Sequence, residues 1–390
     1  MRASVSAFRL VVLLATSAML GCGEDRPSAE FPGHEGPTVL TTPAAGETIA
    51  LELTHSFGAD GQDEEELWFG RAHRLAVGED GRVAITDPVN GCSVVVLQPT
   101  TGEFDRMGDC SDGPDGFRFP TEVEWLADTV VVWDERRGEL AFIHPDEGVS
   151  RRLRLGSPLG IVTSAFGQMG AVSDSLLAVA HSLRGPTSGE RFHLALVDTR
   201  TGEVRDHRIR SPAMADATPG VIATPRMCVH REEGEEVAHV VIANRWTPQM
   251  VVFRADGESL AERANVHVDV PGTRAERQPA DDGEGWSPRS TPTVVCGPDG
   301  FLARWNWWRL IDPEDPESTR VHTRVRMDVI SYSGEYLASI ERTEPITDEA
   351  LLLLPQAWDG RHLFALANLQ FEHPLVRRFR LRIVDETAGQ

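Results

Sequence analysis

Short polar side chains recur where the second strand of each predicted unit of this chain ends. They are Asp87, Asp134, His181, Asn244, Asn306 and Asn368. If the units form a ring, these ends converge round the mouth of a central channel, where they could hold a cation such as Ca²⁺ or a polar ligand. Alternatively, each side chain holds its own loop by accepting hydrogen bonds from backbone N–H groups. The pattern leaves both interpretations open. Ca²⁺ is the one cofactor it suggests, and otherwise no cofactor is expected.

Tryptophans gather near the same strand ends. Trp305 directly precedes Asn306, Trp308 lies two residues after Asn306, and Trp246 lies two residues after Asn244. Indoles near one face could stack on a sugar, an aromatic group or a peptide. Packing between neighbouring sheets is the alternative for each ring. Because side chains alternate along a strand, Trp305 and Trp308 are expected on opposite sides of it.

Composition excludes several kinds of chemistry. The 38 basic residues are all Arg, so lysine chemistry such as Schiff-base formation is impossible. The formal net charge of −22 argues against nucleic-acid binding. No nucleophile elbow, zinc-protease helix motif, dinucleotide loop or EF-hand loop occurs. His230 and His239 fall on the two arms of one predicted hairpin, which we interpret as a chance pairing rather than a site.

Six copies of one signature define the elements that position these residues. Each copy has several apolar residues, a polar turn and then a glycine, and the glycines are Gly102, Gly148, Gly202, Gly257, Gly334 and Gly389. Each glycine is expected to supply the positive φ of a hairpin turn. A further hairpin precedes each copy, at 74–87, 121–134, 170–181, 226–244, 292–306 and 350–368. Four strands per unit and a period near fifty residues predict an all-β fold, a six-bladed β-propeller.

The two ends of this predicted ring fit together. The last copy stops after its third strand, whereas residues 47–57 form a spare strand at the start. We therefore expect the N-terminal strand to complete the last blade, which joins the ends and removes an exposed edge. An open ring is the alternative.

The second unit carries a family resemblance. Its loop Gly113-Pro-Asp-Gly-Phe-Arg-Phe-Pro120, followed by the strand Val130–Asp134, resembles the repeat of NHL-type six-bladed propeller proteins. The resemblance implies the fold for 47–390. It implies little about function, since that family includes signalling scaffolds, extracytoplasmic lipoproteins and a few enzymes.

The N-terminus predicts export and a lipid anchor. Residues 1–21 have a basic start and a short apolar run, and Met19–Cys22 resembles a bacterial lipobox. That resemblance implies that Cys22 carries acyl chains such as palmitate, and Gly23 favours the outer membrane. A simple secretory signal is the alternative. Residues 22–46 contain four prolines and no apolar period, which predicts a flexible tether.

The four other cysteines predict disulfides in an exported chain. Cys92 and Cys110 face each other across a hairpin if its turn centres on Thr101. Cys228 and Cys296 occupy similar places in adjacent blades, so they either form a bridge or remain buried thiols.

Together these features predict a lipid-anchored, extracytoplasmic propeller that acts as a ligand- or protein-binding module. Its expected partners are the membrane, through the anchor, and envelope proteins, peptides or glycans, but not nucleic acid. The alternative is a metal-dependent hydrolase or lyase of the six-bladed kind, acting on a small lactone, ester or sugar-like substrate.

Overall fold

The computed structural model describes most of the chain between Thr38 and Asp385. The described ranges are 38–40, 47–58, 67–89, 91–155, 168–183, 191–210, 225–232, 237–244, 249–268, 293–310, 321–345, 354–367 and 374–385. All regular elements in these ranges are strands, which confirms the all-β prediction. No helix among them could cross a membrane.

The strands form six sheets, each of which is one blade. Blade 1 consists of β3 (Arg74–Val77), β4 (Val83–Asp87), β5 (Ser93–Leu97) and β6 (Phe104–Met107). Blade 2 consists of β7 (Pro120–Leu126), β8 (Thr129–Asp134), β9 (Glu139–His144) and β10 (Gly148–Arg154). Blade 3 consists of β11 (Gln168–Ser173), β12 (Leu176–Leu183), β13 (Arg191–Asp198) and β14 (Val204–Arg210).

The second half of the chain repeats this plan. Blade 4 consists of β15 (Pro225–Arg231), β16 (Ala238–Asn244), β17 (Gln249–Ala255) and β18 (Leu260–Val268). Blade 5 consists of β19 (Thr293–Gly297), β20 (Gly300–Leu310), β21 (Val321–Ile330) and β22 (Tyr336–Pro345). Blade 6 consists of β23 (Leu354–Trp358), β24 (His362–Ala367), β25 (Leu375–Asp385) and β2 (Glu47–Phe57).

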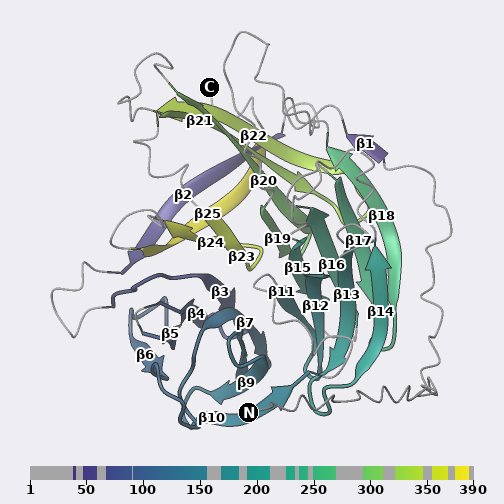
Figure 1. The fold of residues 1–390 in the computed structure, drawn as a ribbon. Coiled ribbons are helices and arrows are strands. Elements are labelled where there is room, and N and C mark those ends of the chain that lie inside the picture. Colours follow the sequence, from purple (N-terminus) through teal and green to yellow (C-terminus); the bar gives the residue numbers. More distant parts are fainter. Residues whose placement is uncertain are drawn as a thin grey trace, which may run out of the picture.

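The first strand of each blade lies innermost, and these six inner strands surround the axis (Figure 1). Each inner strand contacts the inner strand of the next blade, and β23 of blade 6 contacts β3 of blade 1, so the ring is closed. Six apolar clusters fill the spaces between neighbouring blades. A middle strand such as β5 is therefore buried on both faces, which explains its uninterrupted apolar run Val94–Leu97.

The closing strand is confirmed. β2 pairs antiparallel with β25, from Glu47 opposite Asp385 to Phe57 opposite Val376. One short strand lies within the segment 22–46, which the sequence predicts to be a flexible tether. Within residues 22–46, β1 (Thr38–Leu40) pairs in parallel with Val266–Val268 on the outer edge of blade 4, because an unpaired strand edge can accept another segment of chain.

The predicted turn glycines adopt the expected conformation. Gly102, Gly148, Gly202, Gly257 and Gly334 have φ between 75° and 90°. Gly389 lies outside the described residues.

Both disulfides are present, with Cα–Cα distances of 4.9 Å for Cys92–Cys110 and 5.4 Å for Cys228–Cys296. The hairpin register differs by one residue from the prediction, since Val95 lies opposite Arg106. Cys92 precedes β5 and has a φ of 43°, so the first bridge forms beyond the paired strands rather than within them. The second bridge joins the inner strands of blades 4 and 5. Of the two alternatives for Cys228 and Cys296, a bridge or two buried thiols, the structure therefore shows the bridge.

Candidate functional site

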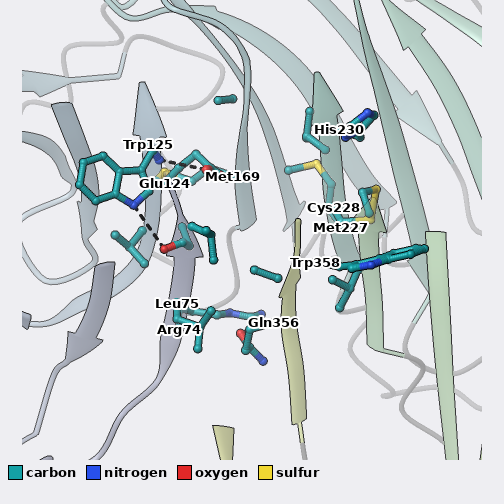
Figure 2. Close-up of a pocket in the computed structure, with 18 of the residues that line it drawn as sticks. Arg74, Leu75, Glu124, Trp125, Met169, Met227, Cys228, His230, Gln356 and Trp358 are labelled. Carbon is teal, nitrogen blue, oxygen red and sulfur yellow. Dashed lines mark hydrogen bonds between the residues drawn. A yellow bond between two sulfur atoms is a disulfide. The ribbon is translucent and has the colours of Figure 1, made fainter. Parts of the chain in front are cut away.

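The inner strands of all six blades enclose a cavity of about 1060 Å³ on the axis (Figure 2). Its wall carries charged, amide, aromatic and sulfur-containing side chains from every side. Its lining runs the length of the inner strands, so the cavity has two ends on the axis. We call the mouth where the inner strands begin the strand-start mouth. We call the opposite mouth, where turns join each inner strand to the second strand of its blade, the turn mouth.

An ion pair between blades 1 and 2 stands at the strand-start mouth. Arg74 Nε lies 3.0 Å from Glu122 Oε1, and both side chains are largely buried. Arg74 Nη1 donates a further 3.0 Å hydrogen bond to Gln356 Oε1 of blade 6. Gln168 Oε1 of blade 3 accepts a hydrogen bond from the backbone N–H of Met227 in blade 4. Polar side chains at this mouth therefore join neighbouring blades.

Glu124 is a carboxyl group on the cavity wall. Its Oε1 accepts the backbone N–H of Trp125 at 2.9 Å, and the carboxyl also accepts the N–H of Ala171 on the next blade. Burial, and to a smaller extent the neighbouring charge of Glu122, raise its pKa to about 7, although the two backbone hydrogen bonds lower it. At neutral pH, Glu124 can therefore exchange a proton.

Two tryptophans seal the gaps between inner strands. The Trp125 indole N–H donates a 3.3 Å hydrogen bond to the carbonyl of Ala76 in blade 1. Trp358 of blade 6 packs on Gly297 of blade 5. Both rings line the cavity wall in Figure 2 but are more than nine-tenths buried, so they offer little surface for stacking on a ligand.

The turn mouth is acidic. Each turn between an inner strand and the second strand of its blade carries a carboxylate, and these are Glu79, Asp128, Asp174, Glu232, Asp299 and Asp359. Arg231, at the end of β15, reaches into this ring: its Nη1 lies 2.5 Å from Asp174 Oδ1 in blade 3 and 3.7 Å from Glu79 Oε1 in blade 1. We call these contacts the Arg231 bridge.

A stack of rings lies beside this mouth. His230 and His239 are direct cross-strand partners in blade 4. Tyr332 of blade 5 stacks on His239 at 4.0 Å between ring centroids, and its hydroxyl donates to the carbonyl of Gly297 at 2.7 Å. Burial lowers the pKa of both histidines, and Glu232 lies 2.8 Å from His239 Nε2. The histidine pair is thus part of the contact between blades 4 and 5.

Asp87 and Asp134 lie outside the cavity lining. Both side chains are fully buried, and each accepts two consecutive backbone N–H groups of the loop that leads into its own blade. Asp87 accepts those of Gly70 and Arg71, both at 2.8 Å. Asp134 accepts those of Arg118 and Phe119, at 2.9 and 3.0 Å. The carboxylates hold loops, which is the arrangement that the loop-holding alternative describes.

Trp305 also lies away from the cavity. Its ring is fully buried between blades 4 and 5, and its N–H donates a 3.1 Å hydrogen bond to Asp328 Oδ2. Asp328 further accepts hydrogen bonds from Arg326 and Ser339, so this tryptophan belongs to a buried polar network.

For the remaining candidate residues, the structure describes either the backbone alone or nothing. His181 lies in β12 opposite His193, and Asn244 ends β16. Asn306 does not end its strand as expected, because β20 continues through Trp308 to Leu310, paired with β21. The side chains of these four residues, and Cys22, Trp246 and Asn368 altogether, lie outside what the structure describes.

The sequence interpretation therefore concentrated on the ends of the second strands and missed the inner strands that line the cavity. One signal was readable: the first turn of every blade carries a carboxylate. Within the described ranges, no three His, Cys, Asp or Glu side chains gather closely enough to hold a metal ion.

A scan with models of known protein families finds no match, and neither does a search of curated protein sequences. Among solved structures, the chain is similar to a member of the DUF4221 family from Bacteroides vulgatus, at 12% identity and a TM-score of 0.52, over 87% of this chain and 99% of that one.

Two weaker similarities have a TM-score of 0.46 and 10% identity. One is to an aldose sugar dehydrogenase from Streptomyces coelicolor in its PQQ-bound form, over 87% of this chain and 100% of that one. The other is to a protein of unknown function from Bacteroides thetaiotaomicron, over 86% and 76%. At these identities the comparisons concern the fold alone, and the similarity to the DUF4221 member, with a TM-score of 0.52, supports the propeller.

Proposed function

We propose that this chain is an exported, lipid-anchored binding protein that takes a small polar ligand into the axial cavity. One observation carries the proposal: a cavity of about 1060 Å³ to which every blade contributes wall residues. Cavities of this size that combine apolar walls with a few polar groups are the usual sites of small ligands.

The wall chemistry supports a polar ligand. Arg74 and Glu122 lie at one mouth, Glu124 on the wall, and Glu79 and Glu232 at the other mouth. The catalytic alternative is a metal-dependent enzyme, and no cluster of metal-ligating side chains in the described ranges favours it over binding. We therefore propose a binding module with no resident cofactor.

The two disulfides support an extracytoplasmic location, since such bonds form and persist in oxidising compartments. We further propose that Cys22 carries the lipid and that the protein resides on the outer membrane, with the membrane and other envelope components as its partners. Labelling with a palmitate analogue tests the anchor. Label should appear on the wild-type chain and disappear in Cys22→Ala, whereas undiminished label on that variant would refute the anchor.

A thermal-shift screen of small polar compounds tests the binding function. A true ligand raises the melting temperature of the full chain by mass action. That rise should shrink in Glu124→Gln and persist in Glu103→Gln, whose carboxylate lies on an exposed hairpin turn outside the cavity. If every compound that stabilises the wild type does so equally in Glu124→Gln, the cavity is not the site.

A further inference from the structure

The turn mouth of the cavity is lined mainly by negatively charged side chains. Glu79, Glu232 and Asp359 belong to its lining, whereas Arg231 is the cation that the described lining offers at that mouth. Carboxylates at the mouth of a low-dielectric cavity raise the local concentration of cations. A ring of surface acids alone would not define a site, so the inference rests on two further observations.

The first is the guanidinium that already occupies the mouth. The Arg231 bridge brings a side chain of blade 4 to carboxylates of blades 3 and 1. The exposed fraction of the side chain is 33% for Arg231, 61% for Asp174 and 82% for Glu79. Ion pairs this exposed are weak and screened by salt, so an external cation can replace the guanidinium at little cost.

The second observation is Glu124, which lines the cavity. Two backbone N–H groups hold its carboxyl, and the charge that acts on it is another carboxylate, Glu122. Glu122 itself pairs with Arg74 at 3.0 Å. A negative charge in a partly buried place is costly without a cation. A cation in the cavity would offset this cost.

We propose that the cavity binds an organic cation, with a guanidinium or ammonium group, that enters through the turn mouth, displaces Arg231 from Asp174 and Glu79, and places its charge near Glu124. This inference depends on the proposed binding function and adds the chemical class of the ligand. The charged end is recognised by carboxylates, and the volume of about 1060 Å³ leaves room for the rest of a small molecule.

Calorimetric titration of the full chain in detergent with agmatine, which carries a guanidinium and an ammonium group, tests the proposal. Agmatine should bind the wild-type chain. Its affinity should fall about tenfold in Glu124→Gln, because one partner of a partly buried charge pair is lost. Arg231→Gln should tighten binding, because the competing internal guanidinium is gone, and Glu103→Gln, the surface control, should change nothing.

The outcomes separate this inference from the binding function on which it rests. If succinate or a neutral compound from the screen binds in a Glu124-dependent way and agmatine does not, the cavity is a ligand site but the cationic assignment is wrong. If agmatine binds equally to wild type, Glu124→Gln and Arg231→Gln, it sits elsewhere and the assignment fails. If neither agmatine nor any compound of the screen binds, both proposals fail.

Discussion

The indole N–H of Trp125 donates a 3.3 Å hydrogen bond across the blade boundary to the carbonyl of Ala76. The same ring lies against Gly78, the first residue after the inner strand β3 of blade 1. Trp358 lies on Gly297 at the boundary between blades 6 and 5. In both places, a tryptophan of one blade covers backbone that only glycine leaves accessible in the preceding blade.

Gly297→Ala should therefore destabilise the protein by about 2 kcal/mol, because the added methyl group meets the Trp358 ring in a packed site. Urea unfolding would measure the change. The double variant with Trp358→Leu separates this cause from a general backbone effect. The cost of Gly297→Ala should largely vanish in the Trp358→Leu background, and strict additivity of the two changes would contradict the contact.

Asp87→Ala and Asp134→Ala should each cost about 3 kcal/mol, because two backbone N–H groups lose a charged acceptor. Asp112→Ala is the matched control, since Asp112 pairs with Arg118 on an exposed loop. Melting curves with Ca²⁺ and with a chelator should coincide for the wild type. A Ca²⁺-dependent rise of several degrees that is lost in Asp87→Asn would instead reveal a metal site.

Glu124 makes stability depend on pH. Its pKa lies near 7 in the folded protein, above the usual value of 4.5, so the folded state binds the proton more tightly than the unfolded state. Its charge therefore destabilises the fold above pH 7, and this penalty disappears as the pH falls towards 4.5. Glu124→Gln should raise stability by up to about 3 kcal/mol at pH 8 and by less than about 1 kcal/mol at pH 5. An equal effect at both pH values would show that the charge is not responsible.

The two disulfides should differ in their contribution to stability. Loop-closure entropy gives about 3 kcal/mol for Cys92–Cys110, separated by 18 residues, and about 4 kcal/mol for Cys228–Cys296, separated by 68. Paired Cys→Ala variants, compared by denaturant unfolding, would measure both. The opposite order would mean that strain or residual structure in the unfolded chain outweighs loop length.

Local chemistry made the fold readable from the sequence. The turn glycines Gly102 and Gly148 mark hairpins because their φ values exclude most other residues. The closing strand 47–57 could be predicted because an unfinished last unit leaves an edge that needs a partner. The end of β20 was misplaced, because nothing in the run Trp305–Leu310 breaks a strand.

The site was harder to predict for a different reason. Asp87 occurs at the expected strand end, but its partners Gly70 and Arg71 come from a loop whose path no periodicity describes. The Arg231 bridge joins blades 4, 3 and 1, and such contacts depend on ring closure rather than on neighbours in sequence. Residues facing the axis are separated by whole blades, so only the assembled ring shows them as one group.

The closure of blade 6 also fixes how the molecule responds to pulling. β2 begins the described body of the ring and lies antiparallel to β25, with paired residues from Glu47 to Phe57. A force applied through the N-terminal segment meets the short pairing of β1 with β18 first. A force that then acts along β2 shears the ladder with β25, so its hydrogen bonds resist together rather than one after another. The strand that closes the ring is therefore also the element through which a membrane tether would load it.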